Sequence, residues 1–400
     1  MSPSLVPRVL VLVCDSWGVG DAPDAAAYGD EGSDTLGNVS RAVGGIHAPN
    51  LGALGLGFLT EIQGVPAAAA QGSGYGRATE RSAGKDSTTG HWEMMGIRLD
   101  TPFPLYPNGF PADVIGAFES AIGRTVLGNK PASGTEIIAE LGEEHMASGR
   151  PIVYTSGDSV FQIACHDDIV PLEQLYEWCR IARRILDGPH RVGRVIARPF
   201  VGTPGHFERS AGRRDFSVPP PGPTVLDHLA DAGVPVYGVG KIADIFCGKG
   251  ITEFSYSDSN DHGIELTLRY LELLPHLRRR EPALVFTNLV DFDSKFGHRN
   301  DPVGYAAAVE ALDRRIPELI RALDGGVMLI TGDHGCDPTT RPTDHSRERT
   351  PLLAAGLPSG PYDIGSRDSF GDLGQTAAAL LGVDAGELEG SSFLNRIGFP

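Results

Sequence analysis

Six aspartate and histidine side chains stand at, or shortly after, the ends of three apolar runs in the sequence. They are Asp15, Asp293, His298, Asp333, His334 and His345. Carboxylate oxygens and imidazole nitrogens without thiolates suit Mn²⁺, Mg²⁺ or Zn²⁺. Six donors are enough for two divalent ions, and two ions ~4 Å apart are the standard clamp for transferring a phosphoryl group. Taken singly, each residue could be a helix cap or a core side chain, so the prediction depends on the constellation.

The second candidate for chemistry is the segment GKDSTTGHWE, which runs from Gly84 to Glu93. It presents three consecutive hydroxyls, Ser87 to Thr89, beside Lys85. A hydroxyl held against two metal ions can become the alkoxide that attacks phosphorus, and the phosphoester formed can be passed to an acceptor. An isolated loop of this composition would more often only cap a helix. Its association with the predicted metal ligands is what favours a nucleophile.

The three apolar runs are typical of β-strands buried on both faces. They are Arg8 to Cys14, Ala283 to Val290 and Val327 to Thr331. Between the second and the third, Val303 to Leu323 has helical spacing, which predicts a strand, helix and strand unit. Ligands of open α/β sheets bind outside the carboxyl ends of the strands, where the aspartates and histidines would meet. The predicted fold class is α/β, with a mainly parallel sheet flanked by helices.

The middle of the chain lies between two proline-rich stretches, TPFPLYPNGFP from Thr101 and PPPGP from Pro219, which are natural linkers. Within it we expect a strand at 152–155, a helix at 172–186 and a strand at 192–201. Beyond it, a helix at 224–232 and a strand at 234–239 resume the earlier pattern. We therefore predict a core domain in two parts, residues 1–100 and 221–400, interrupted by an inserted, smaller α/β cap over residues 101–220.

The composition narrows the choice of partners. Because 34 Lys and Arg face 51 Asp and Glu, the formal net charge is −17, and nucleic acid and anionic membranes are poor partners. Five scattered cysteines form neither a disulfide framework nor a CxxC zinc motif and are typical of reduced thiols. The apolar run ending at Cys14 is too short for a signal sequence, and no stretch reaches the ~18 apolar residues of a membrane span. We expect a cytoplasmic protein.

The motifs together resemble the phosphopentomutases of the alkaline phosphatase superfamily. Long examples are VLVCDSWGVGDAPDA at 11–25, GKDSTTGHWEMMG at 84–96, NLVDFDSKFGH at 288–298 and TGDHGCDPTTRPTDHSRERTPLL at 331–353. Further segments lie at 32–38, 128–137, 153–168, 193–209, 240–245 and 391–395. The resemblance covers essentially the whole chain. It implies an alkaline-phosphatase-like core with an inserted cap.

The resemblance also implies how the metal ligands are shared. One ion would be held by the nucleophile together with Asp15, Asp333 and His334. The other ion would be held by Asp293, His298 and His345.

The nucleophile of this family is the hydroxyl residue directly after Lys-Asp, which here is Ser87, with Lys85 also at the catalytic site. The family usually has Thr at this position, so the chain departs from the pattern. Ser supplies the same Oγ, and related phosphatases use Ser. Thr88 remains an alternative.

Substrate contacts are implied mainly for the cap. The TSGDSV motif points to the pentose and the GRVIARPF and PGHFER motifs to the sugar and its distal phosphate, while Lys241 adds a charge. The residues are Ser156, Asp158, Val160, Arg194, Ile196, Arg209 and Lys241.

The activity implied is the interconversion of α-D-ribose 1-phosphate and D-ribose 5-phosphate, and of the 2-deoxyribose pair, in nucleotide metabolism. Phosphorylated Ser87 would donate its phosphoryl group to give a 1,5-bisphosphate and would then recover the other phosphate. The implied cofactors are two Mn²⁺, or Mg²⁺, Co²⁺ or Zn²⁺, and a sugar bisphosphate activator, glucose 1,6-bisphosphate or ribose 1,5-bisphosphate. Pentose phosphates are the expected partners.

Two other interpretations stay open. A metal-dependent phosphomonoesterase, or a mutase acting on phosphoglycerate, would share the core ligands but not the cap motifs. A catalytically idle binding protein would treat Ser87 as a mark of lost function, although all six ligand positions are filled. The sequence decides neither the metal, nor the preference between ribose and 2-deoxyribose, nor the oligomeric state.

Overall fold

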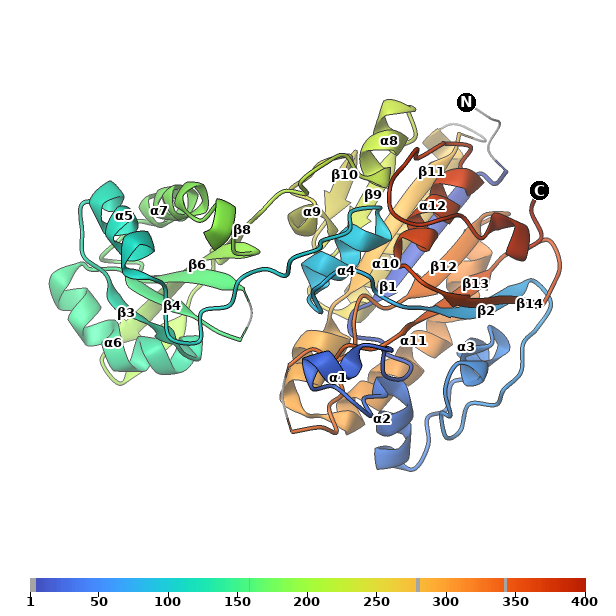
Figure 1. Cartoon of the computed structure of the whole chain (residues 1–400), viewed down its shortest axis with the longest axis horizontal. Helices are drawn as coiled ribbons and strands as arrows, with labels where there is room; N and C mark the ends of the chain where they lie inside the picture. The colour runs from blue at the N-terminus through green and yellow to red at the C-terminus, as the bar shows by residue number, and fades with distance from the viewer. Residues whose placement is uncertain (1–4, 158, 278–280, 342–343) are drawn as a thin grey trace. The chain divides into compact units, whose positions relative to one another are not determined.

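The computed structural model describes residues 5–157, 159–277, 281–341 and 344–400. The chain forms two compact units (Figure 1). The larger unit combines Met1–Thr101 with Pro220–Pro400, and the smaller unit is Pro102–Pro219. Each unit is built around a β-sheet of its own.

The larger unit contains an eight-stranded sheet in the order β10-β9-β11-β1-β12-β13-β2-β14. Its strands are β1 (Arg8–Cys14), β2 (Ser73–Ala78), β9 (Val236–Val239), β10 (Glu253–Ser255), β11 (Ala283–Leu289), β12 (Val327–Thr331), β13 (Thr350–Ala355) and β14 (Tyr362–Arg367). The five strands from β10 to β12 are parallel neighbours. β13 is antiparallel to both β12 and β2, and β14 is parallel to β2. The predicted α/β fold with a mainly parallel sheet is confirmed.

Helices cover both faces of this sheet. They are α1 (Ala25–Tyr28), α2 (Thr35–Val43), α3 (Pro49–Ala53), α4 (Ser87–Met94), α8 (Val225–Asp231), α9 (Ile242–Ile245), α10 (Asn260–Leu277), α11 (Pro302–Ala322) and α12 (Gly371–Leu380). Short 3-10 or π turns lie at Leu56–Phe58, Phe292–Phe296, Gly297–Arg299 and Leu394–Arg396. The helix expected at 224–232 begins one residue later, because Thr224 is its N-cap and forms a capping box with Asp227.

Strand β1 is the centre of the core because it is buried along its whole length. Leu10 and Leu12 face the cluster that includes apolar residues of α2, α3, α10 and α11. α12 contacts β1 and also packs against α4 and α8. Side chains alternate across a strand, so β1 needs apolar residues at every position to fill both layers.

Helix α4 lies unusually close to the end of β12. A Cβ added at Gly90 would lie 2.2 Å from the backbone oxygen of Asp333 and 2.9 Å from its carbonyl carbon. Glycine is therefore required at this helix position, and it lets the helix that carries Ser87 approach the strand end that carries Asp333 and His334.

The smaller unit contains a sheet in the order β3-β4-β5-β6-β7, with β8 paired to β6. Its strands are β3 (Leu127–Pro131), β4 (Ile152–Thr155), β5 (Val160–His166), β6 (Arg194–Thr203), β7 (His206–Arg209) and β8 (Arg214–Ser217). Helices α5 (Ala112–Ile122) and α7 (Leu172–Ile185) pack on one face, and α6 (Gly134–Ser148) packs on the other. A 3-10 turn spans Gly188–His190.

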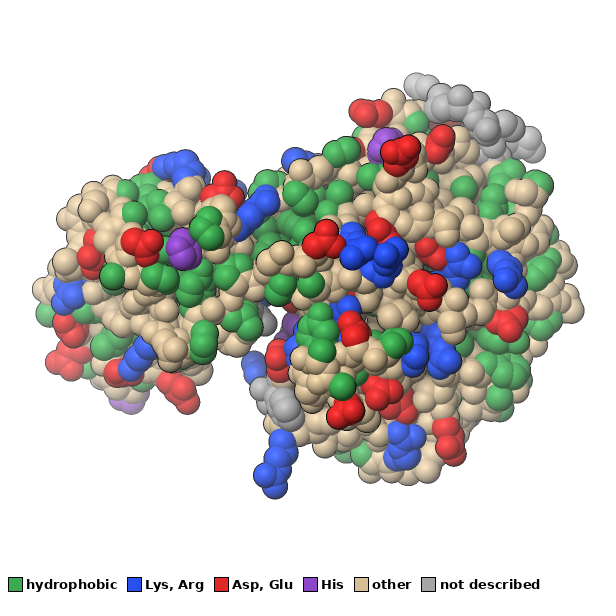
Figure 2. All heavy atoms as spheres, viewed as in Figure 1, with side chains coloured by type: hydrophobic (Ala, Val, Ile, Leu, Met, Phe, Trp, Pro, Cys, Tyr) green, Lys and Arg blue, Asp and Glu red, His purple; other side chains and the backbone are tan. Residues whose placement is uncertain are grey.

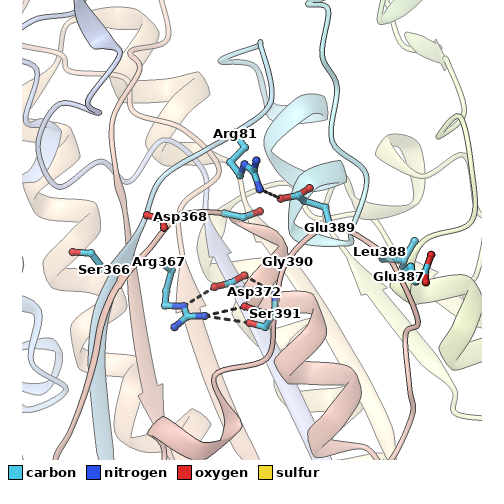
Figure 3. A pocket seen from close by; sticks show the side chains of 11 residues that line it. Arg81, Ser366, Arg367, Asp368, Asp372, Glu387, Leu388, Glu389, Gly390 and Ser391 are labelled. Atoms are coloured by element: carbon cyan, nitrogen blue, oxygen red, sulfur yellow. Dashed lines mark hydrogen bonds and ion pairs between the residues drawn. The ribbon is translucent and has the colours of Figure 1, made fainter.

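A cavity of about 440 Å³ lies beside β14, α12 and the C-terminal segment (Figure 3). Two ion pairs line it: Arg367 with Asp372 at 2.5 Å and Arg81 with Glu389 at 2.9 Å. The second pair joins the C-terminal segment to the rest of the larger unit. Figure 2 shows acidic and basic side chains interspersed over the drawn face of the larger unit.

Among the described helices, none is both long and apolar enough to span a membrane.

The close approach at Gly90 gives a testable expectation. We expect Gly90→Ala to destabilise the protein by roughly 1–3 kcal/mol, because the added methyl group meets backbone atoms that cannot rotate away. Gly116→Ala in α5 is the matched control, since nothing lies within 4 Å of its added Cβ. It should stabilise by up to about 1 kcal/mol through helix propensity. Urea unfolding of both variants measures the difference, and equal stability would contradict the close packing of α4.

Candidate metal centre and active site

The candidate metal ligands lie where β11, β1 and β12 end side by side. The parallel register pairs Cys14 of β1 with Leu289 of β11 and Val13 with Thr331 of β12. Asp15 and Asp333 therefore follow adjacent strands. After β11 the chain turns through Phe292–Phe296, which brings Asp293 back toward the same place. The structure thus gathers all six predicted ligands in the larger unit.

The first group comprises Asp15, Asp333, His334 and Ser87. The Nε2 atom of His334 lies 3.3 Å from Oδ1 of Asp15 and 3.4 Å from Oδ2 of Asp333. It also lies 3.1 Å from the Oγ atom of Ser87. The Nδ1 atom of His334 lies 3.0 Å from the carbonyl oxygen of Gly335, an arrangement in which Nδ1–H donates and Nε2 keeps its lone pair facing the group.

The second group comprises Asp293, His298 and His345. The Oδ1 atom of Asp293 lies 3.3 Å from Nε2 of His298 and 3.3 Å from Nε2 of His345. The two Nε2 atoms are 3.1 Å apart. The ring of His345 also stacks on that of His334 at 3.9 Å, so the two groups are contiguous.

Buried oxygen atoms without partners show that these residues suit metal ions. Within the described residues, Oδ1 of Asp15, Oδ1 of Asp293 and Oδ2 of Asp333 are inaccessible to solvent and accept no hydrogen bond. Leaving a buried carboxylate oxygen unsatisfied is costly. All three point at the imidazole nitrogens described above. Oxygen and nitrogen donors converging in this way fit divalent ions such as Mn²⁺.

The pKa shifts in the cluster reflect attraction between its carboxylates and the cationic groups beside them. Burial alone would raise the pKa of Asp15, but Lys241 and His334 hold that pKa well below its ordinary value. Burial alone would lower the pKa of His334, but Asp333 and Asp15 raise it well above its ordinary value. Both shifts have one cause, since an opposite charge close by stabilises the ionised form of each group.

The hydroxyl of Ser87 is positioned by the first turn of α4. Asp86 is the N-cap of this helix, and its carboxylate accepts hydrogen bonds from the backbone amides of Thr88 and Thr89. It also accepts the hydroxyl of Thr89 at 2.6 Å, so that hydroxyl is occupied locally. The segment therefore caps a helix and, in addition, presents Ser87 to His334.

Two further polar residues of the site were not assigned from the sequence. The Nδ1 atom of His91 lies 2.8 Å from the backbone oxygen of Ser87 and 3.2 Å from Oδ2 of Asp333. The side-chain amide of Asn288 donates to Oδ2 of Asp15 at 3.2 Å. His91 belongs to the GKDSTTGHWE segment, but the sequence did not decide its role. Its helical spacing from Ser87 is the feature that indicates that the two residues are neighbours.

The two predicted lysines pair with different carboxylates, and the printed partners of Lys85 are not candidate metal ligands. The Nζ atom of Lys241 lies 3.4 Å from Oδ2 of Asp15, so this residue lies beside the first metal group. The Nζ atom of Lys85 lies 3.1 Å from Asp30 and 3.5 Å from Asp344. Cys336 also lies at the edge of the cluster, with Sγ 4.0 Å from Nδ1 of His298. Burial raises the pKa of this thiol, which disfavours the thiolate that binds metals.

The predicted substrate contacts of the cap lie in the smaller unit. Val160 and Arg194 are paired neighbours on β5 and β6, and Ile196 follows on the same face of β6. Arg209 ends β7, opposite Phe200. These residues share one face of the sheet with the residues that pack on α6. Ser156 follows β4, and Asp158 lies outside the described residues.

Glu348 holds together the loops that carry the ligands. Its carboxylate accepts the amide and hydroxyl of Thr35, at 2.8 and 2.6 Å, and the hydroxyl of Ser346 at 2.7 Å. It fills the space beside Gly18 and Gly335, where an added Cβ would lie 1.9 and 2.2 Å from its oxygens. The loops after β1 and β12 are thus packed around a single side chain.

Comparisons with known proteins identify the family. The fold and the ligand cluster define a metalloenzyme, and the metalloenzyme superfamily model matches residues 7–385. Phosphopentomutase of Anaeromyxobacter dehalogenans is 57% identical over 98% of this chain and 98% of its own length. Phosphopentomutase of Thermotoga petrophila is 54% identical, over 98% of this chain and 99% of its own. The solved structure of PH0037 protein from Pyrococcus horikoshii has a TM-score of 0.48 at 15% identity, over 96% of this chain and 98% of that one.

The chain belongs to the phosphopentomutases, a family of isomerases within the metalloenzyme superfamily.

Burial of Glu348 predicts a pH dependence of stability. Burial raises the pKa of this carboxyl from 4.5 to about 7, so the folded protein keeps a proton that the unfolded chain releases. Stability should therefore fall as pH rises from about 4.5 to 7. Glu348→Gln removes this titration and should gain on the order of 3 kcal/mol relative to the wild type across that range.

Urea unfolding at several pH values measures this difference. Glu31→Gln, at an exposed carboxylate, controls for the change in net charge. Parallel pH profiles of Glu348→Gln and the wild type would show that Glu348 does not titrate in this range.

Proposed function

We propose that this protein interconverts α-D-ribose 1-phosphate and D-ribose 5-phosphate, and the 2-deoxyribose pair, through a phosphorylated Ser87. The observation that carries the proposal is the position of the Ser87 Oγ atom, 3.1 Å from Nε2 of His334 and therefore beside the first group of buried carboxylates and imidazole. Family membership supports the substrates, because the relatives are phosphopentomutases.

The proposed reaction has two transfers of one phosphoryl group each. In the first, the bond between phosphorus and Oγ of Ser87 breaks as a free hydroxyl of the pentose monophosphate bonds to phosphorus, and the proton of that hydroxyl passes to Ser87. The product is a pentose 1,5-bisphosphate. In the second, Ser87 takes the other phosphoryl group and its proton passes to the sugar oxygen. When bound, two divalent ions would neutralise the phosphoryl oxygens and favour the ionised hydroxyl of Ser87.

Residues of the chain position Ser87 for this reaction and supply positive charge beside it. His334 and Asp333 follow one strand and Ser87 begins one helix, so the attacking atom is fixed by secondary structure rather than by a free loop. Lys241 beside Asp15 adds positive charge at the first metal group. We propose Mn²⁺ as the metal, and a trace of sugar bisphosphate as the source of the first phosphate on Ser87.

We propose that the smaller unit determines the choice of sugar. Val160, Arg194 and Ile196 lie together on one face of its sheet, and Arg209 extends that face. They combine an apolar surface with guanidinium groups, which suits a sugar carrying a phosphate.

The metal assignment predicts a change in stoichiometry. We expect two Mn²⁺ per wild-type chain and one in Asp293→Asn, because the amide replaces the oxygen on which His298 and His345 converge. Elemental analysis after gel filtration gives the count. Asp291→Asn is the matched control: its carboxylate accepts the amide of Asn260 and pairs with Lys295. Two ions in Asp293→Asn would contradict the assignment of the second site.

The nucleophile assignment predicts a selective loss of activity. With Mn²⁺ and a trace of glucose 1,6-bisphosphate, we expect the wild type to convert ribose 1-phosphate to ribose 5-phosphate with little free phosphate. Ser87→Ala should lower kcat/KM on the order of 10³-fold or more, because no oxygen remains to carry the phosphoryl group. Ser87→Thr should stay active, since it restores the same Oγ. Chromatography of both esters and of phosphate follows the reaction.

Thr88→Ala is the matched control at the neighbouring hydroxyl. Intact-mass spectrometry should find a phosphorylated chain in Thr88→Ala and none in Ser87→Ala. The reverse pattern would assign the nucleophile to Thr88. Release of free phosphate without isomerisation by the wild type would identify a phosphatase instead.

A further inference from the structure

His91 lies between the proposed nucleophile and a candidate metal ligand. It follows Ser87 by four residues on α4 and is inaccessible to solvent. Its Nδ1 atom lies 2.8 Å from the backbone oxygen of Ser87 and 3.2 Å from Oδ2 of Asp333. A carbonyl oxygen can only accept a hydrogen bond, so Nδ1 carries the proton and donates to Ser87. One N–H group thus lies beside both residues.

The other ring nitrogen of His91 shows that packing alone does not explain an imidazole here. Within the described residues, Nε2 of His91 is buried and has no hydrogen-bond partner. Such an atom costs free energy that an apolar side chain of similar size avoids. The aromatic neighbour Phe286, at 6.0 Å between ring centroids, would also pack against leucine. The hydrogen bond from Nδ1 is therefore what the imidazole adds at this position.

Toward Ser87, His91 holds the main chain of the first turn of α4. Asp86 accepts two backbone amides of this turn, and His91 donates to the carbonyl oxygen of Ser87. The ends of helices fray readily, so a residue in the first turn needs such support. The Oγ atom of Ser87 lies 3.1 Å from Nε2 of His334. A donor on the carbonyl of Ser87 restricts the rotation that would move this hydroxyl away.

Toward Asp333, His91 lies beside the oxygen that faces the first metal group. Oδ1 of Asp333 accepts the amide of Ser16 at 3.0 Å. Oδ2 accepts no hydrogen bond in the part of the chain that the structure describes, and it lies 3.4 Å from Nε2 of His334. The partial positive charge of the nearby Nδ1–H group favours the ionised carboxylate and leaves the lone pairs of Oδ2 available to an ion. Groups behind the ligands of a metal commonly orient them in this way.

We propose that His91 is a positioning residue, which holds the main chain of Ser87 and the carboxylate of Asp333 in one arrangement for phosphoryl transfer. This inference rests on the proposed function, because it concerns the reach of Ser87 toward the first metal group. His91 acts through these two residues and does not itself touch the transferred group. A misplacement of the reacting atom by about 1 Å can lower a rate on the order of 10²-fold.

Three substitutions separate the hydrogen bond from packing. His91→Asn keeps an N–H donor on the atom bonded to Cγ, where Nδ1 stands, whereas His91→Gln moves the amide one bond further out and His91→Leu has no donor. In the full-length Mn²⁺-loaded enzyme, we expect His91→Leu and His91→Gln to lower kcat about 10²-fold with ribose 5-phosphate, and KM to change less than about threefold. His91→Asn should recover about tenfold of this loss or more. An equal loss in His91→Asn and His91→Leu would overturn the role of the Nδ1–H group.

Stability should rank two of these variants in the opposite order. His91→Leu removes the unsatisfied Nε2 and keeps most of the bulk, so it should unfold at the wild-type temperature or above. His91→Asn leaves a cavity beside a buried polar group, so it should unfold at a lower temperature. Thermal unfolding measures both. A kcat that follows the unfolding temperature from variant to variant would overturn the proposal, because packing would then explain it.

Mn²⁺ binding gives a readout that does not depend on turnover. We expect His91→Leu to bind the ion of the first site about tenfold to 100-fold more weakly, as measured by isothermal titration. Trp92→Phe is the matched control on the same helix, since Nε1 of Trp92 donates to the backbone oxygen of Ile245 at 2.9 Å. It should lower the unfolding temperature and leave both Mn²⁺ affinity and kcat unchanged.

The two proposals fail separately. If the wild type never isomerises ribose 5-phosphate, the proposed function fails, whereas weaker Mn²⁺ binding by His91→Leu still supports the positioning of Asp333. If the wild type isomerises ribose 5-phosphate and His91→Leu matches it in kcat and in Mn²⁺ affinity, the proposed function stands and the positioning role of His91 is overturned.

Discussion

The repulsion among three buried carboxylates is the constraint on which the larger unit depends. Asp15, Asp293 and Asp333 are almost inaccessible to solvent and close enough for their charges to interact. Water cannot screen them there, so the surrounding structure must supply positive charge and hydrogen-bond donors. Lys241 and His334 do this at Asp15, and His345 does it at Asp293. The same arrangement that is costly without cations is one whose oxygen and nitrogen donors suit divalent ions.

Close packing fixes the positions of the residues in this charged cluster. Gly90 allows α4 to rest on the backbone of Asp333, and Glu348 fills the space between the loops after β1 and β12. Arg347, buried beside Glu348, donates to Glu80 and to the backbone oxygen of Gly84, at the start of the segment that carries Ser87. Positions so fixed by secondary structure and by buried polar contacts meet the tight geometric demands of phosphoryl transfer.

The two units present different kinds of side chain. The larger unit concentrates carboxylates and imidazoles, which suit metal ions and phosphoryl chemistry. The smaller unit places Arg194 and Arg209 on one face of its sheet, and guanidinium groups suit an anion. With a net charge of −17, an anionic ligand depends on positive charge that is placed locally.

The sequence by itself determined the parallel strands and the chemical type of the site. Uninterrupted apolar runs such as Arg8–Cys14 are typical of buried strands, and side chains directly after such strands meet at one edge because parallel strands end together. Strand β2 was not predicted, since SGYGRA lacks apolar alternation and becomes a strand only by pairing with β13 and β14. Only the tertiary structure placed His91 against Ser87 and Tyr154 and Arg209 at the start of α6, because contacts between distant residues depend on packing that no local pattern records.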